Sequence, residues 1–172
     1  EVLRRIYDSL NPRDLALFNT SMFMGMDLGG ENTRSRYERG DFLIRNILGI
    51  DPESGALAVD ARVEPYQVVQ FHMRDRDSAA ADLNERLREL ARSPLAPQIR
   101  GALMFSGMGR GERLFGASNH DSDLFARRVR QVSLAGFFCN GEIGPAGGRT
   151  CMHGYTSVFA VICEPEAGDS LL

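Results

Sequence analysis

The chain has 172 residues, 43% of them hydrophobic and 25% charged, a balance that suits one globular domain with a buried core. Its net charge of −3 argues against nucleic-acid binding, which needs a concentrated basic face. No apolar run reaches the 18 residues of a transmembrane helix, and no signal-peptide pattern follows Glu1, so we expect no membrane association.

Cysteine usage predicts a reducing, cytoplasmic setting. Cys139, Cys151 and Cys163 form an odd set without a C-x-x-C pair. This pattern argues against a disulfide framework and against a structural zinc site. No trio of His, Asp or Glu has the spacing of metal ligands either, so we expect neither a metal nor a cofactor.

The N-terminal third mixes helical and extended patterns. Residues 1–12 carry apolar side chains at helical spacing and predict a leading helix. Leu15–Phe18 is a short apolar run, which predicts a strand. Met22–Met26 is a methionine cluster, either core filler or an adaptable binding surface. The polar stretch Asp27–Gly40 predicts an exposed loop.

The middle of the chain predicts a hairpin, a strand and a helix. The apolar runs Phe42–Ile50 and Ala56–Val59 flank the strong turn signal Asp51–Gly55 and predict a β-hairpin. Tyr66–Met73 predicts another strand. Ser78–Arg92 repeats leucines on one face and has the clearest helical pattern of the chain.

The last third contains three predicted strands and a second predicted helix. The strands are Gly101–Ser106, Leu134–Cys139 and Tyr155–Cys163, and residues 164–172 form a tail that we expect to fray. Together the elements predict an α+β fold in one domain, 1–172. Its sheet is expected to be mixed and largely antiparallel, with helices packed against it.

A glycine-rich turn follows the first of these strands. Gly107, Gly109 and Gly111 alternate with other residues, but no Lys-Ser/Thr follows and Glu112 replaces the third glycine of a dinucleotide fingerprint. Successive backbone N–H groups in such a turn can still bind an anion. Arg110 can add a bidentate bond to a carboxylate, or it is simply an exposed turn arginine.

A second turn follows the strand that ends at Cys139. Glu142, beside Asn140, either holds an ammonium group or anchors the turn by accepting backbone N–H bonds. Cys139 is either a small buried residue or a nucleophile whose thiolate is stabilised by His153. His153 either bridges strands or contacts a ligand.

Asn119-His120-Asp121 precedes the second predicted helix. The sequence is most simply a helix cap, provided by Asn119 or Asp121. Asn119, His153 and Thr156 are secondary candidates for ligand contacts.

Five blocks in order give the chain a family resemblance. They are Gly40–Arg45, Val69–Asp75, Gly109–Gly111, Leu134–Pro145 and His153–Thr156. With these blocks the chain resembles the C-terminal domain of the FIST (F-box and intracellular signal transduction) family. Ser106 is a departure, because similar sequences often have Cys there.

The resemblance implies a sensory domain of signalling proteins that binds small ligands such as amino acids. It also implies an N-terminal partner domain, which we expect to be absent from this chain. In one branch of the family the domain belongs to an F-box protein that recruits substrates for ubiquitination.

We therefore predict non-catalytic sensing of a small ligand. Arg110 with the amides of Gly109–Gly111 takes a carboxylate, and Glu142 with Asn140 takes an ammonium group. The full predicted set is Ser106, Gly109, Arg110, Gly111, Asn119, Cys139, Asn140, Glu142, His153 and Thr156. The expected partners are a small amino-acid-like molecule and either the N-terminal domain or a signalling protein.

Two alternatives remain open. The chain can be a protein-interaction module that uses the loop Asp27–Arg39 and the Met22–Met26 cluster. It can also be a cysteine-dependent enzyme that uses Cys139 and His153.

Overall fold

The computed structural model describes residues 2–29, 36–38, 40–129 and 132–164. Its contacts divide the chain into two compact units. Unit 1 comprises Glu1–Asp75 and Gly144–His153, and unit 2 comprises Arg76–Ile143 and Gly154–Leu172. No composition shift in the sequence marks this division, and the single domain over 1–172 stays a prediction.

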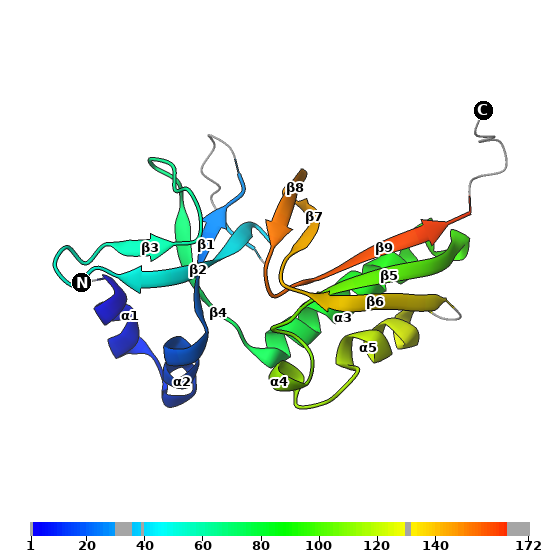
Figure 1. Ribbon diagram of the computed structural model, residues 1–172, viewed down its shortest axis with the longest axis horizontal. Coiled ribbons are helices and arrows are strands. Elements are labelled where there is room, and N and C mark those ends of the chain that lie inside the picture. Colours follow the sequence, from blue (N-terminus) through cyan, green and yellow to red (C-terminus); the bar gives the residue numbers. More distant parts are fainter. Residues whose placement is uncertain (1, 30–35, 39, 130–131, 165–172) are drawn as a thin grey trace. The chain divides into compact units, whose positions relative to one another are not determined.

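Unit 1 is built around a four-stranded antiparallel sheet in the order β3-β2-β1-β4 (Figure 1). Its elements are α1 (Val2–Ser9), α2 (Pro12–Ser21), β1 (Met22–Asp27), β2 (Phe42–Ile50), β3 (Leu57–Val59), β4 (Val69–Met73) and β8 (Arg149–His153), with β7 (Glu142–Ala146) entering from unit 2. The β2–β3 hairpin and the leading helix confirm two predictions. The methionine cluster lies in the central strand β1, where Met24 and Met26 are buried as core.

The predicted strand Leu15–Phe18 is wrong, because these residues belong to α2. Asn11 precedes the helix and its side chain accepts a hydrogen bond from the Asp14 amide at 3.0 Å. Pro12 occupies the first turn, where its missing N–H is not needed. These start signals outweigh the strand preference of a four-residue apolar run.

Several predicted boundaries also differ from the structure. The strand predicted over Tyr66–Met73 begins only at Val69, because Tyr66 has a left-handed backbone with φ 64°. The strands β7 and β8, joined through Gly147 and Gly148 at positive φ, were not predicted. The predicted loop Asp27–Gly40 falls partly on residues 30–35 and 39, which lie outside the described residues, as does the tail after Glu164.

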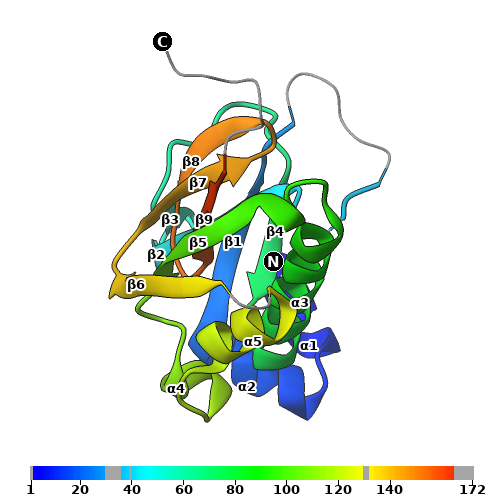
Figure 2. The same cartoon turned by 90° about the vertical axis from the view of Figure 1, so that its right-hand side faces the viewer.

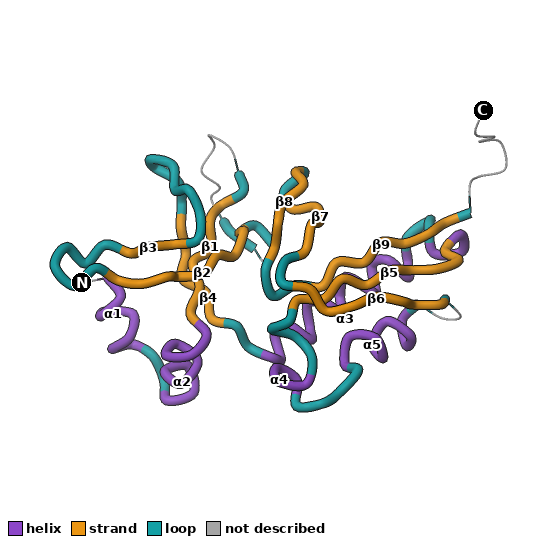
Figure 3. The backbone as a smooth tube through the Cα atoms, viewed as in Figure 1, coloured by secondary structure: helices purple, strands orange, loops and turns teal. Residues whose placement is uncertain are grey.

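Unit 2 contains a three-stranded sheet in the order β6-β5-β9, with β5 parallel to β6 and antiparallel to β9. Its elements are α3 (Arg76–Arg92), a 3-10 helix (Ala96–Gln98), β5 (Ile99–Gly107), α4 (Glu112–Phe115), α5 (His120–Arg128), β6 (Ser133–Cys139) and β9 (Ser157–Cys163). Figure 3 shows helices and strands in both units. The α+β prediction, with a mixed and largely antiparallel set of strands, is confirmed.

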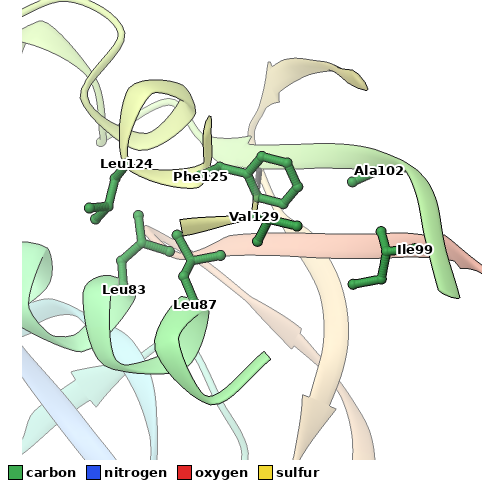
Figure 4. Close-up of a cluster of buried hydrophobic side chains, with 7 residues drawn as sticks. All are labelled: Leu83, Leu87, Ile99, Ala102, Leu124, Phe125 and Val129. Atoms are coloured by element: carbon green, nitrogen blue, oxygen red, sulfur yellow. The ribbon is translucent and has the colours of Figure 1, made fainter. Parts of the chain in front are cut away.

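The core of unit 2 lies between the sheet and the helices α3 and α5, which cover the same face (Figures 1 and 2). Leucines from α3, an apolar face of α5 and residues of β5 pack together there (Figure 4). The cluster consists of Leu83, Leu87, Ile99, Ala102, Leu124, Phe125 and Val129. Phe125 also stacks on Phe159 of β9, with ring centroids 5.4 Å apart. Both predicted helices therefore bury the faces that their periodicity indicated.

The opposite face of this sheet is apolar but open. Strand register places Leu103 beside Ala135, and Phe105 beside Phe137, on the face away from the helices. Leu103, Phe137 and Ile162 are 39%, 60% and 54% exposed. No helix in the described part of the chain is long and apolar enough to cross a membrane.

Candidate functional site

Three segments of unit 2 meet where β5 and β6 end. The amide of Gly107 donates to the Thr156 carbonyl at 2.8 Å, and the amide of Met108 donates to the Cys139 carbonyl at 2.9 Å. The Arg110 amide then donates back to Gly107 and closes the turn. The two glycine-rich turns singled out in the sequence are therefore tied together, although about thirty residues separate them.

Arg110 is held inside the unit by a bidentate ion pair. Its Nε lies 2.6 Å from Oδ2 of Asp121 and its Nη2 lies 3.1 Å from Oδ1. The guanidinium also lies over the Phe115 ring, 5.2 Å from its centroid. The His120 ring stacks on Phe115, with ring centroids 3.6 Å apart. Arg110 is only 9% exposed, so the interpretation as an exposed turn arginine is wrong.

Asp121, in the first turn of α5, contacts three side chains. Besides Arg110, Nδ1 of His120 lies 2.9 Å from Oδ1 and Oγ of Ser157 lies 2.8 Å from Oδ2. Burial raises the pKa of the Asp121 carboxyl, but Arg110, His120 and Ser157 more than offset burial and hold that pKa below its usual range. Asp121 is therefore a carboxylate at neutral pH.

Two serines carry the network from Asp121 to β5. Ser157 uses its hydroxyl proton on Asp121, so the Ser106 hydroxyl donates to Ser157 Oγ, 2.9 Å away. Ser106 is 1% exposed and its carbonyl lies 3.6 Å from Sγ of Cys139. A continuous line of polar contacts thus runs from Arg110 to Cys139.

Glu142 ends this line and is also buried, at 1% exposure. Its Oε2 accepts from the Thr156 hydroxyl at 2.9 Å and from the Thr156 amide at 3.3 Å. Its Oε1 lies 3.7 Å from Sγ of Cys139. The structure therefore places Glu142 as an anchor of the turn that accepts a backbone N–H.

The Cys139 thiol is poorly disposed to ionise. Desolvation, and after it the negative charge of Glu142, raises the pKa of this thiol above its usual range. His153, proposed from the sequence as its activating partner, belongs to unit 1, where Nε2 lies 3.2 Å from the carbonyl oxygen of Gly144.

The glycines of the site meet specific steric needs. A Cβ on Gly107 would lie 2.8 Å from Oε1 of Glu142 and 3.0 Å from the Tyr155 backbone. Gly111 has φ 84° and a Cβ there would lie 3.2 Å from the Phe138 ring. Close approach of backbone and side chains thus explains these two positions.

The remaining predicted residues occupy more exposed positions. Asn140 is exposed and Gly109 is half-buried. Asn119 precedes α5 in a left-handed conformation with φ 58°, and its side chain forms no cap bond, so the predicted cap is wrong at this residue. Asp121 is not the cap either, because it lies in the first turn of α5 and binds Arg110.

Sequence reasoning missed the part played by Asp121 and Ser157. The Asn119-His120-Asp121 stretch has the composition of a helix start, so nothing in the sequence indicated that Asp121 binds Arg110. Ser157 lies at the start of an apolar strand and carries no local signal of its own. Among the described residues, no group of three or more His, Cys, Asp or Glu is placed to hold a metal.

Comparison with known families agrees with the resemblance. The model of the FIST C domain matches residues 1–145, which include both glycine-rich turns. This chain belongs to the FIST C domain family. FIST C domains are sensory domains of signal-transduction proteins, and the chain's family membership carries that general role.

Curated relatives of this FIST C domain are longer proteins. The uncharacterized protein Mb0898c of Mycobacterium bovis is 37% identical over 163 residues, which cover 94% of this chain and 41% of the relative. The uncharacterized protein Rv0628c of Mycobacterium tuberculosis is 40% identical over 126 residues, covering 73% of the chain and 33% of the relative. The F-box/LRR-repeat protein At5g63520 of Arabidopsis thaliana is 28% identical over 111 residues, covering 58% and 21%. The chain thus spans less than half of each of these relatives.

Proposed function

We propose that this FIST C domain senses a small ligand such as an amino acid, which binds where β5 and β6 end. One observation carries the proposal: two turns remote in the sequence are tied together and share one buried polar network. The carboxyl ends of parallel strands are a common ligand-binding position in sheets. The parallel pair β5–β6 ends at Gly107 and Cys139, within this network.

Competition between a ligand carboxylate and Asp121 for Arg110 would let the site respond to ligand binding. A ligand carboxylate is a planar bidentate acceptor, like the Asp121 carboxylate that holds Arg110 in the free protein. When the ligand takes Arg110, Asp121 keeps its contacts to His120 and Ser157. Ser157 also bonds Ser106, so the exchange reaches β5. Asn140, exposed at the second turn, receives the ammonium group, and buried Glu142 positions that turn.

Binding measurements on two variants test this competition. Asp121→Asn removes the competing negative charge and is expected to tighten amino-acid binding, whereas Arg110→Gln abolishes it. Arg113→Gln is the matched control, because Arg113 is exposed on neighbouring α4 and loses the same charge. Affinities are measured by NMR titration of the folded chain with a set of amino acids at 25 °C.

The proposal fails if no amino acid binds the wild type at millimolar concentration. It also fails if Arg110→Gln, shown to be folded by its spectrum, binds as tightly as Arg113→Gln.

A second function, protein interaction, is favoured by the open face of the β6-β5-β9 sheet. Leu103, Phe137 and Ile162 present apolar surface there, and exposed apolar patches commonly mark interaction sites. This surface replaces the Met22–Met26 cluster considered from the sequence, whose Met24 and Met26 are buried. Capture of a partner by the wild type and its loss in Phe137→Ser would support this function, and equal capture would exclude the face.

We also propose that the domain is not an enzyme and that it works in the cytoplasm. The raised pKa of the Cys139 thiol supports the first point, because a thiolate is the reactive form. The three cysteines, all free, are consistent with a reducing compartment.

A further inference from the structure

A hollow of about 860 Å³ opens in unit 1, and no residue of the predicted site is among those that line it. The end of β1, the start of β2, the segment between β3 and β4, and strand β8 line it. We propose that this hollow binds a small organic carboxylate with an apolar or aromatic body. The hollow is a second site, with none of the residues of the site where β5 and β6 end. Its biological role rests on the proposed sensing function, and its binding can be tested separately.

The size of the hollow suits such a ligand. Small-molecule sites in proteins commonly measure about 300–1,000 Å³ and combine apolar walls with a few polar groups. Its apolar lining residues include Leu43, Pro65 and Met152, and its charged lining residues include Arg45, Asp60 and Arg149.

Two arginines can receive the carboxylate. Nη1 of Arg45 donates to the Met152 carbonyl at 2.9 Å, which fixes the side chain against β8. Its Nε and Nη2 have no partner among the described residues, and the side chain of Arg149, which is exposed, has none there either. Arg62 differs, since its Nε lies 3.0 Å from Glu64. The guanidinium groups of Arg45 and Arg149 therefore keep donors available for a bidentate bond.

Tyr66 provides a second, independent observation at the same hollow. Its backbone has φ 64°, a conformation that bulky residues rarely adopt, and its side chain is fully exposed. Strained backbone of this kind tends to occur at functional positions. An exposed aromatic ring that lines a hollow can cover the apolar body of a ligand.

Arg149 and Arg110 differ in whether a carboxylate of the protein already binds the guanidinium group. In unit 2 the free protein already satisfies the guanidinium with Asp121. In unit 1, Arg149 forms no ion pair with a carboxylate of the described residues. Asp60, exposed and without a side-chain partner among the described residues, lets the same hollow accept the ammonium group of a zwitterion.

Three probes that share a phenyl ring separate the charges: phenylacetate, L-phenylalanine and 2-phenylethylamine. Each is titrated into the full chain while ¹H–¹⁵N spectra are recorded. We expect phenylacetate and L-phenylalanine to shift signals of residues 43–45, 60–68 and 149–152, and 2-phenylethylamine, which lacks the carboxylate, to shift them less. Arg149→Gln is expected to weaken phenylacetate binding about tenfold, the effect of losing one charged hydrogen-bonding partner.

Arg5→Gln is the matched control, because Arg5 is exposed on α1 of the same unit and does not line the hollow. Thermal unfolding confirms that both variants are folded. Phenylacetate shifts confined to residues 107–111 and 139–142 would overturn the inference and leave the proposed function standing. No phenylacetate shift at millimolar concentration, or equal affinity of Arg149→Gln and Arg5→Gln, also overturns it. If L-phenylalanine shifts neither unit, the proposed function loses support as well.

Discussion

Arg110 and Asp121 form an ion pair with two parallel contacts, of 2.6 Å and 3.1 Å, and both side chains are less than 10% exposed. The pair connects the turn after β5 to the first turn of α5. Its position decides what the glycine-rich turn can do, because any anion at Arg110 has to compete with a carboxylate already in place.

Removing one half of this pair should destabilise the protein strongly. Arg110→Gln is expected to lower the free energy of unfolding by about 3–5 kcal/mol, because a buried charge then lacks its partner. Urea unfolding at pH 7 measures the change. Arg113→Gln should stay within about 0.5 kcal/mol, as exposed substitutions usually do. A loss below about 1 kcal/mol for Arg110→Gln would mean that the pair is not maintained in solution.

The same pair predicts sensitivity to acid. The pKa of Asp121 in the folded protein lies below its unfolded value of about 3.9. The stabilising contribution is therefore complete above that value and is lost as the pH falls through the folded pKa. Unfolding measured from pH 7 to pH 2 should show wild-type stability falling below about pH 4. Asp121→Asn should lose less over that range, and identical acid profiles would contradict the assignment.

Gly107 should not tolerate a methyl group. Gly107→Ala places Cβ within 2.8 Å of Oε1 of Glu142 and within 3.0 Å of the Tyr155 backbone. We expect a loss of about 1–3 kcal/mol, the usual effect of overpacking. Gly154→Ala is the control, since its Cβ meets nothing within 4 Å and it has no positive φ. Equal melting temperatures of the two variants would argue against the close packing of this turn.

Cys139 should react slowly with alkylating reagents. Its pKa is raised by desolvation and by the charge of Glu142, so the thiolate fraction at pH 7.5 is smaller than that of an ordinary cysteine. Iodoacetamide labelling followed by peptide mass spectrometry measures the rate at Cys139, with a short unstructured cysteine peptide as reference. A rate at pH 7.5 faster than that of the reference peptide would revive the nucleophile hypothesis.

The cap of α2 offers a comparison within one helix. Asn11→Ala removes the bond to the Asp14 amide and is expected to lower stability by about 1 kcal/mol. The same change at Asn19, exposed inside α2, should be neutral or slightly stabilising because alanine favours helix interiors. Calorimetric melting distinguishes the two, and a greater loss at Asn19 would contradict the assigned cap.

The sequence predicted elements well where a pattern was long. The leucines of α3 recur at helical spacing from Leu83 to Leu90, so their periodicity identified both the helix and its buried face. Leu15–Phe18 was too short for that test, and the capping side chain of Asn11 decided the outcome. Local sequence patterns therefore predicted the type of element correctly only where they extended beyond a few residues.

The candidate site was predictable in its parts but not in its pairings. Arg110 and Glu142 attracted attention because charges between glycines are unusual, and both lie in the polar network. Their partners could not be identified, because the ion pair with Asp121 and the bond to Thr156 depend on tertiary contacts. The hollow of unit 1 was missed for the same reason, since its lining comes from segments far apart along the chain.

Unit 1 is discontinuous along the chain, and this has a practical consequence for dissecting it. A protein truncated after Asp75 would keep β1 to β4 but lose Gly144–His153. Such a fragment would lack Arg149 and the Met152 carbonyl that orients Arg45. Reconstitution would require adding back a synthetic peptide for the missing hairpin, so limited proteolysis between the units should yield pieces that stay associated rather than two independent products.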